Sequence, residues 1–261
     1  MSDDRQLDLQ RAAVELGVHY QTAYRWVRTG KLPSQIVNGH YLIGQSDIDQ
    51  LATQRTRPRV PKPPSTKRLH RTSERIHDAL VSGDEAVVRQ LARGLVAEGT
   101  SIAELIQAAL VPALVRIGAE WHAGLLTISV EHRASAIVER LLGELSPNPR
   151  GRRRGTVMVA AVSGDLHSLP TSMAAVTLRS DNWAVEHLGA DMPPSELVRF
   201  CVEHDIDVAV LSSTNPLTAP LAADTADQLR KAGIPTVLGQ PGSTLDDLIH
   251  ATRAAAAAAR S

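Results

Sequence analysis

The sequence contains a single cysteine, Cys201, and aromatic residues make up only 3% of its 261 positions. One cysteine excludes an intrachain disulfide and fits a reducing cytosol. There is no N-terminal apolar run of signal-peptide length, and no stretch reaches membrane-spanning length. These absences predict a soluble, cytoplasmic protein with no membrane partner. Apolar residues make up 43% of the chain, which is enough for the cores of two or three domains.

Charge is distributed unevenly along the chain, although the formal net charge is zero. Residues 1–71 hold twelve Lys and Arg against six Asp and Glu, whereas the remaining residues hold sixteen against twenty-two. A basic head on an acidic body indicates a polyanionic partner. A solvated basic linker is the alternative, and charge alone does not separate the two.

Composition divides the chain into successive segments. A compact, mixed segment spans residues 1–54, and a linker rich in Pro, Lys and Arg spans residues 55–72. A helical segment spans residues 73–147, and strands alternate with helices over residues 155–260. The sequence therefore predicts a multidomain protein with three folded parts.

The first segment has the pattern of a winged helix-turn-helix. Asp8 is placed to cap a short helix that ends at Gly17, and a second helix follows over residues 19–28. Asn38-Gly39 then lies between two apolar runs, which is a strong signal for a β-hairpin. Helix, glycine turn, helix and hairpin in this order predict a DNA-binding head.

The outer face of the second helix carries side chains of the kinds that contact base edges and phosphates. The candidates are Tyr20, Gln21, Thr22, Arg25 and Arg28 on this helix, with His40 and Tyr41 on the hairpin. Residues 7–53 resemble the MerR and excisionase-type DNA-binding head. The resemblance implies that the second helix enters the major groove of a double-stranded DNA operator. One such head reads few base pairs, so we expect a homo-oligomer, from dimer to tetramer.

The helical segment reads as a four-helix bundle with a polar corner. Trp121-His122 ends one helix, and Glu131-His132 lies eight residues later at the start of the next. An aromatic ring, two imidazoles and a carboxylate would converge at one end of the bundle. The alternative is an ordinary helix end with a core tryptophan and surface histidines.

The last segment reads as a doubly wound α/β domain. The predicted strands are Thr156–Val162, Ala184–Leu188, Val208–Ser212 and Thr236–Gly239. Ligands of such folds bind outside the carboxyl ends of the strands, where His167 and Ser212 lie. The loop before His167 lacks the phosphate-binding glycine motifs. Asp165 lies two residues before His167, a spacing that favours a carboxylate orienting the imidazole for metal binding. This Asp-x-His motif alone is weak evidence for a metal site.

The segment Gly164-Asp-Leu-His-Ser-Leu-Pro170 is similar to the Asp-x-His-x-x-Gly loop of cobalamin-binding domains of flavodoxin-like fold, and HLGADMPPSELV and VLSST match the stretches that follow. The bundle corner resembles the cap of CarH-type (CarA/LitR-like) MerR-family photoreceptor regulators. These proteins join a head, a four-helix cap and a cobalamin-binding domain in the same order. The resemblance therefore covers nearly the whole chain and implies a transcriptional regulator, most simply a repressor, rather than an enzyme.

The resemblance also implies residue roles. His167 would bind cobalt of adenosylcobalamin from below, with Asp165 behind it, and Trp121 would lie over the upper face. Light would break the cobalt–carbon bond, after which His122 would take the upper cobalt position. The remaining cofactor-binding candidates are Glu131, His132, Ser212 and Gly239.

The sequence departs from the family pattern at two places. Pro170 stands where the loop has its last glycine, and Gly239-Gln240-Pro241-Gly242 stands where the family has Gly-Gly. These departures leave open an alternative, a regulator of the same architecture that senses another ligand or a partner protein.

Overall fold

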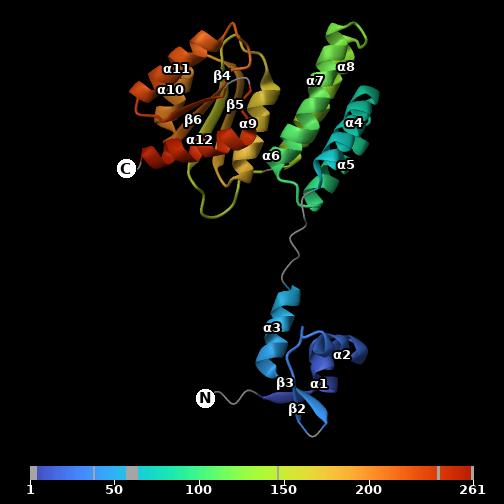
Figure 1. The fold of residues 1–261 in the computed structure, drawn as a ribbon. Coiled ribbons are helices and arrows are strands. Elements are labelled where there is room, and N and C mark those ends of the chain that lie inside the picture. Colours follow the sequence, from blue (N-terminus) through green and yellow to red (C-terminus); the bar gives the residue numbers. More distant parts are fainter. Residues whose placement is uncertain (1–4, 38, 57–63, 146, 240–241, 260–261) are drawn as a thin grey trace. The chain divides into compact units, whose positions relative to one another are not determined.

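The computed structural model describes residues 5–37, 39–56, 64–145, 147–239 and 242–259. The chain forms two compact units, which divide between Pro61 and Lys62. Each unit is described by itself (Figure 1).

The N-terminal unit is a helix-turn-helix with a small antiparallel sheet. Its elements are β1 (Gln6–Asp8), α1 (Leu9–Glu15), α2 (Tyr20–Arg28), β2 (Gln35–Val37), β3 (His40–Gly44) and α3 (Gln45–Thr56), with sheet order β1-β3-β2. The core is formed mainly by alanine and leucine side chains from the first two helices and by Ile43 and Ile48. The predicted order of helix, turn, helix and hairpin is confirmed.

Local backbone chemistry fixes the ends of these helices. The Asp8 side chain caps α1 by accepting a hydrogen bond from the backbone N–H of Arg11 at 2.8 Å. Gly17 and Gly30 follow the two helices with φ angles of +62° and +71°, values that favour glycine. In the hairpin Val37 pairs with His40, as a two-residue connection requires, and Asn38 of the predicted turn lies outside the described residues.

The C-terminal unit begins with a helical bundle. Its helices are α4 (Thr66–Ser82), α5 (Glu85–Ala97), α6 (Ile102–Leu105), α7 (Val111–His122) and α8 (Ile128–Leu145), and a π-helical turn, η1 (Ile106–Leu110), joins α6 to α7. Ser101 caps α6 through the backbone N–H of Glu104. The π-helical turn ends two residues before Pro112, whose nitrogen carries no hydrogen for a helical hydrogen bond.

The predicted linker over residues 55–72 was wrong for its last seven residues. Helix α4 begins at Thr66 rather than at Ser73. Leu69 and Thr72 lie on the same helix face as Ile76 and are buried. The abundance of Lys and Arg around these positions concealed the helical spacing of the buried ones.

The segment Ile102–His122 corrects a second prediction. By length and composition it could cross a membrane, so the expectation that no stretch reaches this length was wrong. In this structure Leu105, Ile106 and Leu110 of the segment are fully buried in the bundle core. The core helix of a bundle passes the same test, so the segment is weak evidence for a membrane span.

A four-stranded parallel sheet follows the bundle. Its elements are β4 (Thr156–Val162), α9 (Ser168–Ser180), β5 (Ala184–Met192), α10 (Pro194–Glu203), β6 (Val208–Ser212), α11 (Ala219–Lys231), β7 (Thr236–Gly239) and α12 (Leu245–Ala258), with strand order β5-β4-β6-β7. Val157 and Val159 of β4 pack with α9 and α12, whereas Met158 and Ala160 pack with α10 and α11. The doubly wound fold and its four predicted strands are confirmed, although β5 extends four residues past the predicted end at Leu188.

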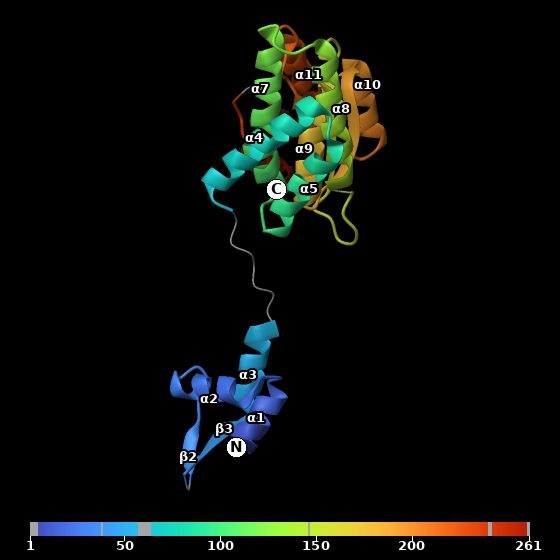
Figure 2. The same cartoon turned by 90° about the vertical axis from the view of Figure 1, so that its right-hand side faces the viewer.

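Helix α9 joins the bundle to the sheet. Met173 and Val176 belong to the bundle core, whereas Ala175 and Leu178 pack against the sheet. Figure 1 shows α9 between the two layers, and Figure 2 shows α4 and α5 in front of α8 and α9, on the side of the bundle away from the sheet. Because α9 begins directly after the His167 loop, this packing holds the bundle beside that loop.

Candidate functional site

His167 lies at the carboxyl end of β4, in the N-cap position of α9. Its Nδ1 atom is 2.7 Å from Oδ1 of Asp165, and its backbone N–H donates to the same oxygen at 3.2 Å. The His167 side chain is 61% exposed, whereas the Asp165 side chain is 1% exposed. A buried carboxylate thus holds an outward-facing imidazole in one orientation.

The Asp165 carboxylate is itself held by neighbouring backbone. Oδ2 accepts hydrogen bonds from the amides of Thr214 at 3.2 Å and Asn215 at 3.4 Å. Burial would raise the pKa of Asp165, but the hydrogen bonds from the His167 ring and these amides outweigh it and lower the pKa. Asp165 is therefore ionised at neutral pH and favours the His167 tautomer with its proton on Nδ1.

The other ring nitrogen of His167 is available to a ligand. Nε2 makes no hydrogen bond within the part of the chain that the structure describes. A carboxylate behind Nδ1–H raises the basicity of Nε2, which is the usual support of a metal-binding histidine. The donor chemistry therefore fits a histidine that would bind the cobalt of a cobalt-containing cofactor.

Pro170 is compatible with this loop. It is the third residue of α9, which begins at Ser168. The first four amides of a helix have no partner within the helix, so proline removes none of its backbone hydrogen bonds there.

The bundle corner contributes the opposite wall of the site. Glu131 Oε2 lies 2.6 Å from His132 Nδ1, and its Oε1 accepts a hydrogen bond from the Ser135 hydroxyl at 2.9 Å. Trp121 is 36% exposed at the end of α7. The corner therefore presents an aromatic ring and a fixed carboxylate from two helices.

One cavity of about 510 Å³ joins this corner to the His167 loop. It is lined by Trp121, Glu131, His132, Ser135, Leu166, His167, Ser168, Leu169 and Pro170. Four predicted site residues, from positions far apart in the sequence, thus face one space. Leu166 is 74% exposed beside it, which leaves apolar surface for a ligand to cover.

Four other predicted cofactor residues do not line this cavity, and one of them is Asp165, which lies buried behind His167. His122 Nδ1 is 3.0 Å from the Gly118 carbonyl, and its ring lies against Trp121 at 4.6 Å between centroids. Ser212 and Gly239 pair with each other at the carboxyl ends of β6 and β7. Gln240, the second departure from the family pattern, lies outside the described residues.

Sequence reasoning missed several residues around the site. Ser135 stands four residues after Glu131, a spacing that places both on one face of a helix. The amides of Thr214 and Asn215 are 49 and 50 positions from Asp165, and only the parallel pairing of β4 with β6 brings them together.

A second polar cluster behind the corner was also missed. His77 on α4 is buried, and its Nε2 lies 2.8 Å from Oε2 of Glu120 on α7. Arg116 donates to Oε1 of Glu120, also at 2.8 Å. The hydrogen bond with His77 lowers the pKa of Glu120, and burial, which opposes it, is the smaller effect. Glu120 directly precedes Trp121, so this cluster anchors the corner to α4.

We expect Glu120→Gln to reduce the free energy of unfolding at pH 7 by about 1–3 kcal/mol, because Nε2 of the buried His77 loses its charged partner. Since the folded pKa of Glu120 lies below its ordinary value of 4.5, the carboxylate stabilises the fold above pH 4.5. This contribution is lost as the pH falls through the folded pKa. Urea unfolding of both proteins at pH 7 and in acid measures the difference, which should shrink in acid.

Glu74→Gln is the matched control, because Glu74 is exposed and pairs only loosely with His70 at 3.7 Å. It should change stability by less than about 0.5 kcal/mol. Equal effects of the two variants would contradict the anchoring role of Glu120.

The head presents most of its candidate residues to solvent. Tyr20, Gln21, Arg25, Arg28 and His40 are exposed, whereas Thr22 and Tyr41 are half-buried. Tyr41 packs against the head core, as Trp26 does.

Tyr24 was not predicted as a site residue, although it connects the second helix to the hairpin. Its ring stacks on Tyr20 at 6.5 Å and meets Tyr41 edge-on at 6.0 Å. It is 40% exposed. The spacing from Tyr20 to Tyr24 is one helical turn and was the available signal.

Comparison with protein families matches each part of the chain. A model described as a helix-turn-helix domain matches residues 7–56, and two models described as B12 binding domains match residues 72–146 and 155–259. The fold and the site therefore define a helix-turn-helix protein with a two-part B12-binding module.

Two transcriptional repressors are similar to parts of this chain. The chain is 35% identical over 125 residues to the HTH-type transcriptional repressor CarA of Myxococcus xanthus, which covers 45% of the chain and 42% of CarA. It is 33% identical over 134 residues to the repressor CarH of the same organism, which covers 50% of the chain and 44% of CarH. Parts of the chain are therefore similar to the repressors CarA and CarH. These alignments span less than half the length of either repressor.

A solved structure supports the fold of the C-terminal unit. The monomethylamine corrinoid protein of Methanosarcina barkeri superposes with a TM-score of 0.51 at 19% identity, over 71% of this chain and 95% of that one. At this identity the similarity concerns the fold alone.

Proposed function

We propose that this protein is a transcriptional regulator, not an enzyme, that binds a double-stranded DNA operator through its head and is controlled by adenosylcobalamin. The observation that carries the proposal is the single cavity that joins His167, held by a buried carboxylate, to Trp121 and Glu131 of the bundle. Similarity to two repressors supports repression as the direction of control. A cytoplasmic, DNA-associated location follows from this role.

The residues present would divide the binding between two domains. His167 would bind cobalt from below through Nε2, with Asp165 fixing its orientation. Trp121 would pack over the upper ligand, and Glu131 and His132 would enclose it. When bound, adenosylcobalamin supplies a cobalt–carbon bond that light can break. His122, which lies beside Trp121 outside the cavity, would reach the upper face only after the corner moves.

Control of DNA binding requires that the ligand favour one assembly state over another. Residues of α7 and α8 and of the His167 loop line the same cavity. A change of the ligand on the Trp121 side of this cavity would therefore alter the packing of α7 and α8. We propose that the dark, adenosylcobalamin-bound form is an oligomer, dimer or tetramer, that holds several heads on one operator. Light would then release the DNA.

The direct test is to mix the protein with adenosylcobalamin in the dark and remove free ligand by gel filtration. A co-eluting chromophore whose absorption spectrum and elution volume change after green light would support the proposal. A colourless protein peak would contradict cobalamin control and favour a regulator with another input. A chromophore unaffected by light would contradict photoreception alone.

His122→Ala tests the proposed upper position. We expect the dark complex to form and bind DNA as the wild type does, because His122 does not line the cavity. After illumination the spectrum should differ from that of the wild type, because the proposed upper imidazole is missing. Identical light spectra of the two proteins would refute the role of His122.

A further inference from the structure

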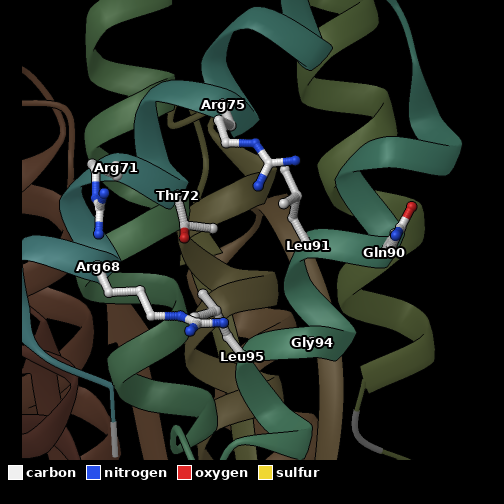
Figure 3. A pocket seen from close by; sticks show the side chains of 8 residues that line it. All are labelled: Arg68, Arg71, Thr72, Arg75, Gln90, Leu91, Gly94 and Leu95. Atoms are coloured by element: carbon white, nitrogen blue, oxygen red, sulfur yellow. The ribbon is translucent and has the colours of Figure 1, made fainter.

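A groove on the outer side of the bundle, separate from the His167 cavity, is lined by three arginines. It lies between α4 and α5 and has a volume of about 440 Å³. Figure 3 shows Arg68 and Arg75 extending from α4 toward α5, with Arg71 on the side of α4 farther from α5. Leu91 and Leu95 line its α5 side.

The positive charge of this groove is largely unpaired. Arg71 and Arg75 are exposed, and neither forms an ion pair with any residue that the structure describes. Arg68 pairs with Glu98 at the end of α5. The fold therefore does not use the guanidinium groups of Arg71 and Arg75 to balance an acidic neighbour.

The groove continues a basic tract that starts at the end of the head. Residues 55–75 contain one acidic residue, Glu74, and eight basic ones: Arg55, Arg57, Arg59, Lys62, Lys67, Arg68, Arg71 and Arg75. The described part of the head ends at Thr56, and α4 begins at Thr66. The chain between them can span at most about 35 Å, which is about one helical turn of DNA.

We propose that this arginine groove binds the phosphate backbone of the DNA that flanks the site of the head. The proposal rests on the proposed function of the head. Guanidinium groups bind phosphate oxygens with two parallel hydrogen bonds, and the neutral Thr72 and Gln90 that share the groove also donate to phosphate. The contact adds affinity but reads no sequence, and the chain length confines it to about one turn of flanking DNA.

The test compares the full-length chain with the double variant Arg71→Gln/Arg75→Gln on two duplexes. Both carry a sequence that the wild type selects from a random pool. One covers only the site of the head, and the other extends by about one helical turn on each side. On the long duplex we expect the variant to bind about tenfold more weakly than the wild type. The slope of log K plotted against log salt concentration should decrease in magnitude by about 1.8. On the short duplex the two proteins should bind alike.

The matched control is Arg199→Gln/Arg230→Gln, which removes two exposed arginines from the α/β domain, where each pairs with an acidic neighbour on its own helix. It should leave the salt slope on the long duplex unchanged. Thermal unfolding of all three proteins checks that the substitutions leave the fold intact.

Several results would overturn the proposal. An unchanged slope on the long duplex, or equal losses on both duplexes, would exclude a flanking contact. Altered sedimentation of the Arg71→Gln/Arg75→Gln variant without DNA would identify a protein interface instead. Stabilisation of the wild type but not the variant by inorganic pyrophosphate, with DNA binding unaffected, would identify a small-anion site. A wild type that binds no DNA would refute the proposed function as well.

Discussion

Replacing His167 with alanine is expected to abolish retention of adenosylcobalamin through gel filtration. In the structure His167 presents Nε2 to solvent while Asp165 fixes Nδ1 at 2.7 Å. Loss of a supporting residue behind a metal ligand typically costs 10–100-fold in affinity, so loss of the ligand itself should cost more than about 100-fold. Titration with adenosylcobalamin in the dark, followed by absorption spectroscopy, measures the change.

Two further variants are compared with His167→Ala. Asp165→Asn keeps an oxygen that can accept the Nδ1–H bond but removes the charge, so about 10–100-fold weaker binding is expected. His204→Ala removes an exposed histidine at the C-cap of α10 whose Nδ1 contacts the Phe200 carbonyl, and this variant should bind as the wild type does. Unchanged affinity of His167→Ala, or an equal loss in all three variants, would show that His167 is not the lower ligand.

Strands β4 and β6 could be predicted because each is a run of apolar residues buried on both faces. The run from Thr156 to Val162 needs helices on two sides, and the structure supplies both layers. The turn glycines Gly17 and Gly30 were equally predictable, because their φ angles are unfavourable for other residues. These features depend on local sequence alone.

The composition of the cavity could be predicted only in part. Trp121, Glu131, His132 and His167 were all identified as candidates, but nothing in their spacing shows that α9 packs between the bundle and the sheet. Ser135 and the leucines beside His167 enter the site only through that packing. The pairing of His77 with Glu120 joins positions 43 residues apart and has no local signal.

The start of α4 at Thr66 was not predicted, because the composition of the segment concealed its helical pattern. A segment rich in Lys, Arg and Pro usually cannot form a core. Here the basic residues around Thr66 occupy the outer face of a helix, while Leu69 and Ile76 occupy the inner face. Composition averages the two faces of an amphipathic helix, whereas the spacing of its apolar residues separates them.

Replacing Arg25 with alanine is expected to weaken operator binding by about 1–3 kcal/mol, which is roughly 5- to 150-fold in affinity. Arg25 is exposed on α2, the helix that the resemblance places in the major groove. Its removal should leave thermal unfolding unchanged, because its side chain is outside the head core. Fluorescence anisotropy with an operator duplex, measured over a range of salt concentrations, determines the affinity and the salt slope.

The pattern of the loss distinguishes the two kinds of contact that Arg25 can make. A contact to a base edge would weaken binding to the operator more than to unrelated DNA and relax preference at one position. A phosphate contact would weaken binding to all sequences alike and lower the salt slope by about 1. Arg199→Ala, on α10 of the other unit, carries the same charge change and should bind as the wild type does. Full retention of operator binding by Arg25→Ala would show that the outer face of α2 is not the DNA-reading surface.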